Sequence, residues 1–149
     1  MAPATGASTW FSTAFGYDFR FNQAPDVRLV PADDGSVAYD TPSGNVATFA
    51  VSGSGFTTPP GRDATLVRNG DGTYDLTFHA SADVMHFGAD GNLLRDTDRN
   101  GNHLDFAYPD GRRVTTISST AGTAPGNVVT IDYSGPAGRV ASMSQTAVK

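Results

Sequence analysis

Length, composition and charge limit the kinds of protein this chain can be. It has 149 residues, no cysteine, and 10 basic against 15 acidic residues, which gives a formal net charge of −5. This length is enough for one domain with a hydrophobic core, and the absence of cysteine excludes disulfide bonds and thiolate metal sites. An acidic chain without a basic cluster argues against nucleic-acid binding, and the lack of a long apolar run argues against membrane insertion.

The choice of residue types predicts an all-β fold with little or no helix. Every acidic residue is aspartate and the only lysine is Lys149, so the surface helix formers Glu and Lys are nearly absent. Thr, Val, Phe, Tyr, Gly and Asp take their place, and these residues favour strands and tight turns. We expect a single all-β domain over residues 1–149.

Residues 10–63 are predicted to form aromatic-rich strands followed by a loop. The segment WFSTAFGYDFRF at 10–21 is dense in aromatic side chains, and their alternation after Tyr17 predicts a strand over 16–22. Two interpretations of these aromatics stay open. They are buried in a core or plug, or they form a ligand platform in which Trp10 and Tyr17 stack on a sugar. Residues 52–63, SGSGFTTPPGRD, are predicted to be a loop because adjacent prolines cannot join a ladder.

Residues 64–149 are predicted to be a series of hairpins. Asp-Gly and related pairs recur between short alternating runs, which is a strong signal for β-hairpins. The turn glycines Gly72, Gly91 and Gly111 are 19 and 20 residues apart, and Gly138 follows after 27. A fixed period is typical of stacked supersecondary units. A further turn of the same kind is predicted upstream, at Asp34-Gly35.

Alternation within these runs predicts a sheet with one apolar and one mixed face. In 103–108, Leu104, Phe106 and Tyr108 share one face, and His103 and Asp105 lie on the other. A sheet with one packed face and one wetter face has this pattern.

The stretch DTDRNGN, residues 96–102, has two interpretations. Asp96, Asp98 and Asn100 are spaced like the first half of a calcium loop, but the residue at its twelfth position is Ala107 instead of a bidentate glutamate. The alternative is a turn at Asn100-Gly101 in which aspartates cap backbone amides. The turn is the favoured interpretation, and Asp96, Asp98 and Asn100 remain the calcium ligands to test.

No pattern in the sequence indicates catalysis. The histidines His79, His86 and His103 fall in predicted strands of adjacent hairpins, where cross-strand or solvated positions are more common than a zinc site. The chain has no G-x-S-x-G or H-E-x-x-H motif, and nothing singles out a carboxylate pair for glycoside hydrolysis. We therefore predict a protein that is not an enzyme and needs no cofactor.

The stretch GADGNLLRDTDRNGNHLDFAYPDGRRVTTI at 88–117 resembles an RHS (YD-type) repeat. The resemblance rests on a turn at Asp90-Gly91, the run Asp98 to Asn102, Tyr108 and a second turn at Asp110-Gly111. The segment IDYSGPAGRVASM at 131–143 is similar to a further copy, and residues 10–78 are similar to the segment that opens many RHS shells. The resemblance implies a curved or coiled sheet of antiparallel hairpins over 64–149, after the strands and loop of 10–63.

The resemblance also implies a function and a location. Complete RHS proteins form hollow shells around toxic domains, or cell-surface assemblies, in secreted or surface-exposed bacterial proteins. We therefore expect a scaffold or wall segment, with the rest of a shell, a toxin cargo or a second copy at the sheet edges as partner. The alternative is a module that binds a glycan or a protein. The start MAPATGAST lacks the charged and apolar parts of a signal peptide.

Overall fold

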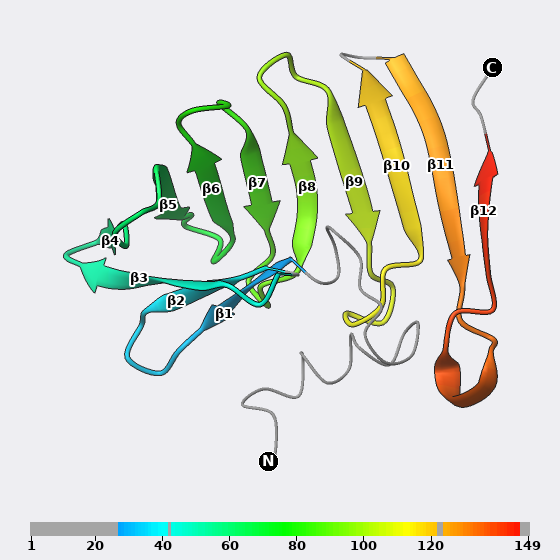
Figure 1. Ribbon diagram of the computed structural model, residues 1–149, viewed down its shortest axis with the longest axis horizontal. Coiled ribbons are helices and arrows are strands. Elements are labelled where there is room, and N and C mark those ends of the chain that lie inside the picture. Colours follow the sequence, from blue (N-terminus) through cyan, green and yellow to red (C-terminus); the bar gives the residue numbers. More distant parts are fainter. Residues whose placement is uncertain (1–26, 42, 122–123, 147–149) are drawn as a thin grey trace.

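The computed structural model describes residues 27–41, 43–121 and 124–146, and it confirms the all-β prediction. The strands form two antiparallel sheets in which each strand pairs with its neighbours in sequence (Figure 1). Neither sheet is closed or strongly curled. No helix in the described part of the chain is long and apolar enough to cross a membrane.

The smaller sheet has four strands in the order β1-β2-β3-β4. Its bounds are β1 Arg28–Pro31, β2 Val37–Asp40, β3 Val46–Ser52 and β4 Gly55–Thr57. The strand β4 lies inside the segment predicted as a loop, and this part of the prediction is wrong. Phe56 pairs with Val51 of β3, because the chain reverses tightly at Gly53, whose φ of +60° suits glycine. Pro59 and Pro60 lie outside the strands, as predicted.

The larger sheet has eight strands in sequential order. Its bounds are β5 Ala64–Arg68, β6 Tyr74–Phe78, β7 Val84–Phe87, β8 Leu93–Thr97, β9 His103–Ala107, β10 Thr116–Ala121, β11 Ala124–Asp132 and β12 Ser142–Thr146. A 3-10 turn, η1, covers Pro136–Gly138 between β11 and β12. The strand predicted over 16–22 lies outside the described residues.

The hydrophobic core lies between the smaller sheet and the first strands of the larger one, and it extends to the buried Phe106, Val114 and Ile131. The smaller sheet contributes Leu29 and Phe49, which are 0% and 1% exposed, and the larger contributes Leu76, Phe87 and Leu93, each 0% exposed. The ring of Tyr39 lies against Phe78 and Phe87, with centroids 6.1 and 6.5 Å apart. In Figure 1 the four-stranded sheet lies on the side of β5–β8, and no described strand covers β9–β12.

The two sheets meet where β1 passes the turn between β7 and β8. The amide of Leu29 donates to the carbonyl of Gly91 at 2.9 Å, and Arg28 forms an isolated bridge with Asn92. A Cβ built on Gly91 would overlap the Leu29 carbonyl oxygen. Only glycine fits this close approach, so Gly91 fixes the distance between the two sheets.

Candidate functional site

One turn geometry recurs along the chain. In the turn between β5 and β6, the Gly72 amide donates to the Asn69 carbonyl at 3.0 Å, and Gly72 has a φ of +88°. The Asp71 carboxylate accepts the Thr73 amide at 3.0 Å and the Thr73 hydroxyl at 2.6 Å. Carboxylates in the same position accept the amide two residues later at Asp34, Asp90 and Asp110.

The aspartates of these turns keep ordinary backbone angles. Among the described residues, the non-glycine with positive φ is Ala82, and the left-handed positions of these turns belong to glycine. The loops are therefore type I turns followed by a left-handed glycine, instead of two-residue turns that need positive φ at both positions. The abundance of Asp-Gly pairs is explained by backbone capping.

The capping contacts stabilise the ionised carboxylates. Hydrogen bonds from the Ser36 and Thr73 side chains lower the pKa of Asp34 and Asp71 respectively. At Asp110, partial burial acts to raise the pKa, but the amides of Arg113 and Arg112 and the Arg113 guanidinium outweigh it and lower the pKa to about 2. These carboxylates are mostly exposed, and their effect on stability is small.

Contacts between successive turns join one hairpin to the next. The buried Asn92, 4% exposed, donates from Nδ2 to the Gly111 carbonyl at 2.7 Å. The Tyr133 hydroxyl donates to the Val114 carbonyl at 2.8 Å. Each contact spans 19 residues, which matches the spacing of the turn glycines, so the sequence period corresponds to a period of physical contacts.

The run from Asp96 to Asn102 forms the turn between β8 and β9. The Asp98 carboxylate accepts the amides of Asn100 and Asn102 at 2.8 and 3.0 Å and the Asn102 side chain at 2.8 Å. The Gly101 amide donates to the Asp98 carbonyl at 3.0 Å. Led by the Asn102 side chain, these hydrogen bonds lower the pKa of Asp98. The capped turn that was favoured from the sequence is therefore present.

Asp96 lies in β8, next to the last residue of the strand. It is half-buried, and burial, followed by the charges of Asp83 and Asp98, raises the pKa of its carboxyl group. No cluster of three or more histidine and acidic side chains able to hold a metal ion is found in the part of the chain that the structure describes. Calcium binding by Asp96, Asp98 and Asn100 stays a prediction to be tested in solution.

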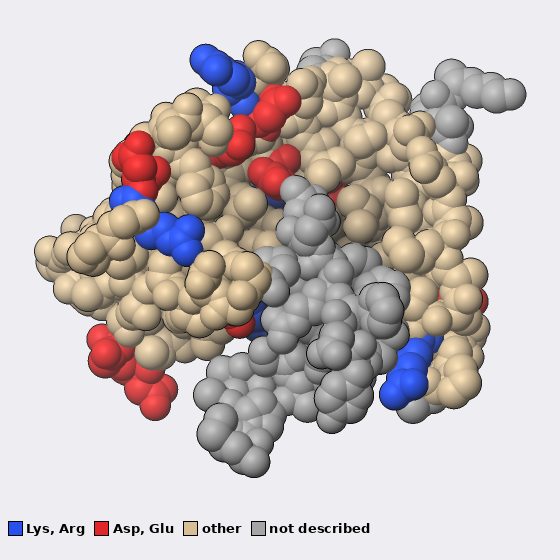
Figure 2. Space-filling model, in the orientation of Figure 1, with Lys and Arg blue, Asp and Glu red and all other residues tan. Residues whose placement is uncertain are grey.

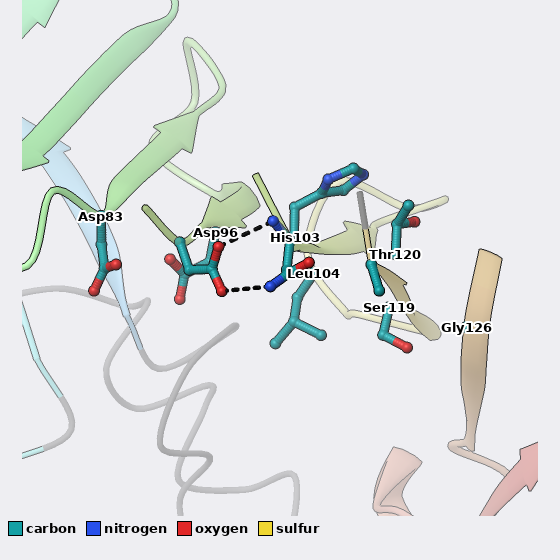
Figure 3. Close-up of a pocket in the computed structure, with 10 residues that line it drawn as sticks. Asp83, Asp96, His103, Leu104, Ser119, Thr120 and Gly126 are labelled. Atoms are coloured by element: carbon teal, nitrogen blue, oxygen red, sulfur yellow. Dashed lines mark hydrogen bonds between the residues drawn. The ribbon is translucent and has the colours of Figure 1, made fainter. Parts of the chain in front are cut away.

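A hollow of about 350 Å³ lies beside this turn. In Figure 3, Asp83 and Asp96 line one side, and Leu104, Ser119 and Gly126 line the other. Acidic side chains gather over the upper ends of β7 and β8 on this face of the molecule (Figure 2). A second hollow, of about 440 Å³, shares Asp83 and Asp96 and extends toward Arg62 and Phe78.

A row of charged side chains crosses the other face of the large sheet. Asp75, His86, Arg95 and Asp105 stand opposite one another on β6, β7, β8 and β9. His86 Nδ1 lies 2.7 Å from Asp75 Oδ1, and Arg95 donates to both oxygens of Asp105, at 2.5 and 3.2 Å. Cross-strand pairs of opposite charge stabilise a sheet modestly.

The remaining histidines also lie beside aspartates. His79 Nδ1 is 2.6 Å from Asp63 Oδ1, and His103 Nε2 is 3.5 Å from Asp105 Oδ2. His86 and His103 lie in β7 and β9, as predicted, but His79 lies in the turn just after β6 instead of in a strand. Each of the three histidines is beside a carboxylate. Trp10 and Tyr17, the candidate ligand-binding residues, lie outside the described residues.

Comparisons with known proteins found no match: no family model, no curated protein and no solved structure is similar to this chain at a significant level. The similarity to RHS repeats therefore rests on the residues quoted above.

Sequence reasoning missed two features that the structure brings forward. One is the hollow between Asp83 and Leu104. It was missed because Asp83 lies in the connection between β6 and β7, where the sequence has no recognisable motif. The other is Asn92, whose burial follows from its place between two turns. The sequence did contain a signal for Asn92, because this residue directly follows Gly91, one of the turn glycines that recur at the repeat spacing.

Proposed function

We propose that this chain is a non-enzymatic wall segment of an RHS-like repeat protein, secreted or on the surface of a bacterium. Its role is to form a sheet that the rest of a shell, or a toxin cargo enclosed by that shell, packs against. The curved, coiled form of such a wall belongs to this proposal. The contacts that recur between successive turns, at Asn92–Gly111 and Val114–Tyr133, are the observation that carries it.

Repeated contacts of this kind favour a wall because they make each hairpin depend on its neighbours. In such a stack, stability is the sum of the stabilities of the single repeats and of the interfaces between neighbouring repeats. A binding site instead needs one irregular constellation of side chains. In the described residues the polar groups that recur are turn caps and cross-strand pairs, whose hydrogen bonds are used within the sheet.

An insertion of one hairpin unit, defined as residues 93–112, tests this proposal. The unit contains β8, its turn, β9 and the next turn. A second copy placed after Arg112 adds two strands and keeps the direction of every later strand. We expect a folded β-rich protein that melts near the temperature of the parent, measured by circular dichroism.

The matched control inserts a second copy of only residues 93–102 directly after Asn102, which adds one strand and one turn. This insertion reverses the direction of β9–β12 and moves Gly111 to the end of the sheet away from Asn92. We expect it to unfold or aggregate. If the whole-unit variant fails in the same way as the half-unit variant, the chain is not a modular wall and the proposal is wrong.

A binding module is the second candidate, favoured by the hollow between Asp83 and Leu104 and by the aromatic segment around Trp10. The substitution Trp10→Ala separates the two functions. In a binding module it lowers affinity for a glycan or protein ligand at unchanged stability. In a wall segment we expect it to lower the melting temperature and to leave glycan-array signals at the parent's background level.

A further inference from the structure

Asp63, His79 and Thr65 form a continuous chain of hydrogen bonds at the start of the large sheet. His79 Nδ1 lies 2.6 Å from Asp63 Oδ1, and His79 Nε2 lies 2.7 Å from the Thr65 hydroxyl oxygen. Both nitrogens of one imidazole ring are therefore engaged, one by a carboxylate and the other by an alcohol. The contacts of His86 and His103 are instead with carboxylates and a backbone carbonyl.

The register of the β5–β6 hairpin brings these three side chains together. Thr65 of β5 is opposite Thr77 of β6, and just beyond the strands the His79 amide donates to the Asp63 carbonyl at 3.0 Å. Asp63 and Thr65 are two residues apart, so their side chains point to the same face of the sheet. His79 is directly opposite Asp63 and diagonal to Thr65, and both relations are within reach of a long side chain.

The neighbours of His79 determine which ring nitrogen carries the proton. An ionised carboxylate can only accept hydrogen bonds, so Nδ1 donates to Asp63. Nε2 of the neutral ring then has a free lone pair, and the Thr65 hydroxyl donates to it. A carboxylate, an imidazole and an alcohol in this order are the arrangement in which histidine acts as a general base toward a hydroxyl nucleophile.

The hydroxyl end of this chain of hydrogen bonds faces solvent. Thr65 is exposed between the buried Ala64 and Leu66, and the side chains of His79 and Asp63 are 48% and 72% exposed. A small electrophile can therefore reach Thr65 without any opening of the fold. Thr65 lines neither of the two hollows that contain Asp83. Its reactivity thus depends on the hydrogen bonds, without a binding cavity that would favour rapid turnover.

We propose that Thr65 is a modification site that accepts an acyl group from an activated ester. The Thr65 oxygen attacks the ester carbonyl carbon while His79 Nε2 takes the hydroxyl proton. The bond from that carbon to the leaving oxygen then breaks, and Nε2 returns the proton to the leaving oxygen. The products are a threonine ester and a free alcohol.

Asp63 is a positioning residue in this reaction. Its carboxylate keeps the ring of His79 in the required tautomer and stabilises the positive charge that forms on the ring. The inference goes beyond the proposed function, because a wall segment that turns over no substrate can still carry such an ester.

The first test treats the full chain with p-nitrophenyl acetate, a small activated ester, and locates acetyl groups by peptide mass spectrometry. We expect an acetyl ester on Thr65 that hydroxylamine removes, which distinguishes it from acetyl groups on amines. Thr65→Val keeps the β-branched shape without the hydroxyl and is expected to lose this label. The matched control is Thr77→Val, which removes the hydroxyl of the residue opposite Thr65 and should leave the label on Thr65 unchanged.

The second test measures whether His79 and Asp63 act on Thr65 through the hydrogen bonds. His79→Gln should slow acetylation of Thr65 by about 100-fold or more, because general-base assistance contributes roughly 10²–10⁴-fold. Asp63→Asn should slow it by a smaller factor, and Asp63→Glu should recover part of the parent's rate. The control is His86→Gln, whose ring pairs with a different carboxylate, and it should react at the parent's rate. Circular dichroism checks that every variant is folded.

An acetyl group found on His79 and not on Thr65 overturns the proposal, as does a Thr65 rate that His79→Gln leaves unchanged. Equal labelling of Thr65 and Thr77 also overturns it, because of these two hydroxyls it is Thr65 that contacts a histidine nitrogen. None of these results changes the outcome expected from the hairpin-unit insertion. Failure of this proposal is therefore distinguishable from failure of the proposed function.

Discussion

The two ends of the large sheet are made from similar hairpins but are stabilised differently. In β5–β8, Leu76, Phe87 and Leu93 are fully buried against the smaller sheet. In the described part of β10 no residue is buried, and all of β12 is exposed. The turns at Gly72 and Gly91 near one end and at Gly138 near the other are nevertheless alike in having a left-handed glycine.

This difference indicates that turn chemistry determines the architecture and packing determines where its stability resides. The turn of each hairpin and the neighbouring strands set its pairing register, whether or not a second sheet covers it. The packed end contributes most of the hydrophobic stabilisation, since burial of apolar area is the main force that favours folding.

The largest effect is expected at the packed end. Phe87 is 0% exposed, and Phe87→Ala should lower the free energy of unfolding by about 3–5 kcal/mol through lost burial and a residual cavity. Met143→Ala on the exposed β12 should change it by less than about 0.5 kcal/mol in the monomer. Urea denaturation of both variants at low protein concentration measures the contrast, and similar losses would mean that the two ends do not differ.

Two turn glycines with nearly the same backbone angle give the next test. Gly91 and Gly101 have φ of +86° and +84°, but only the Cβ of Gly91 would collide with β1. Gly101→Ala should cost about 1–2 kcal/mol for the left-handed backbone, and Gly91→Ala should cost more because it also separates the sheets. Equal losses in urea denaturation would show that the Leu29–Gly91 contact is not important.

The contact between turns is tested by Asn92→Ala. The substitution removes the hydrogen bond from the buried Asn92 to the Gly111 carbonyl at 2.7 Å, and the loss of such a hydrogen bond costs about 0.5–1.5 kcal/mol. The control is Asn100→Ala at an exposed turn position, with an expected change within about 0.5 kcal/mol. If Asn92→Ala leaves the melting temperature unchanged in thermal denaturation, the Asn92–Gly111 contact does not stabilise the sheet. The repeat interpretation then loses its main support.

Sequence reasoning was most successful where structure is local. The turns at Asp34-Gly35, Asp71-Gly72, Asp90-Gly91 and Asp110-Gly111 connect consecutive strands, because a glycine that accepts positive φ terminates a strand whatever its surroundings. The capped turn around Asp98 follows from the same chemistry.

The features that depend on distant contacts did not follow from the sequence. The hairpins expected over 64–149 form one eight-stranded sheet, but the packing of a separate four-stranded sheet on its first strands was not predicted. That packing depends on Leu29 meeting Gly91, residues far apart in the sequence. The strand β4 was missed because the glycines around it are typical of loops. Trp10 and Tyr17 lie outside the described residues, so their role stays a prediction.

Acid is expected to weaken the turns. Folding lowers the pKa values of Asp34, Asp71, Asp98 and Asp110. Their contribution to the stability of the folded state is therefore full above the unfolded pKa, about 3.9, and is lost as the pH falls through the folded pKa values. For Asp110 the loss extends to about pH 2.

The pH test compares the parent with Asp110→Asn between about pH 5 and 2, the range over which such carboxylates titrate. The variant should be less stable at the upper end and lose less stability on acidification, because it no longer has a carboxylate to protonate. Asp96 has the opposite effect on the pH dependence of stability. Burial raises the pKa of its carboxyl group, so its contribution to the free energy of unfolding decreases as the pH rises above the ordinary carboxyl pKa. A denaturation midpoint that falls equally in both proteins would contradict the role given to Asp110.

Calcium should have the smallest effect. The Asp98 carboxylate already accepts hydrogen bonds from the turn, so we expect the melting temperature to be the same in EDTA and in millimolar calcium. A calcium-dependent rise that disappears in Asp96→Asn would instead establish the metal site, because a ligand that binds only the folded state stabilises it.

Residue-resolved amide exchange of the parent chain tests most directly whether the sheet is a stack of hairpins stabilised by nearest neighbours. We expect opening free energies that are highest in β6 and β7, where the core is densest, and that fall in steps of one hairpin toward β12. One common opening free energy for all strands from β5 to β12 would contradict this, because the sheet would then unfold as a single cooperative unit and not as a series of repeats.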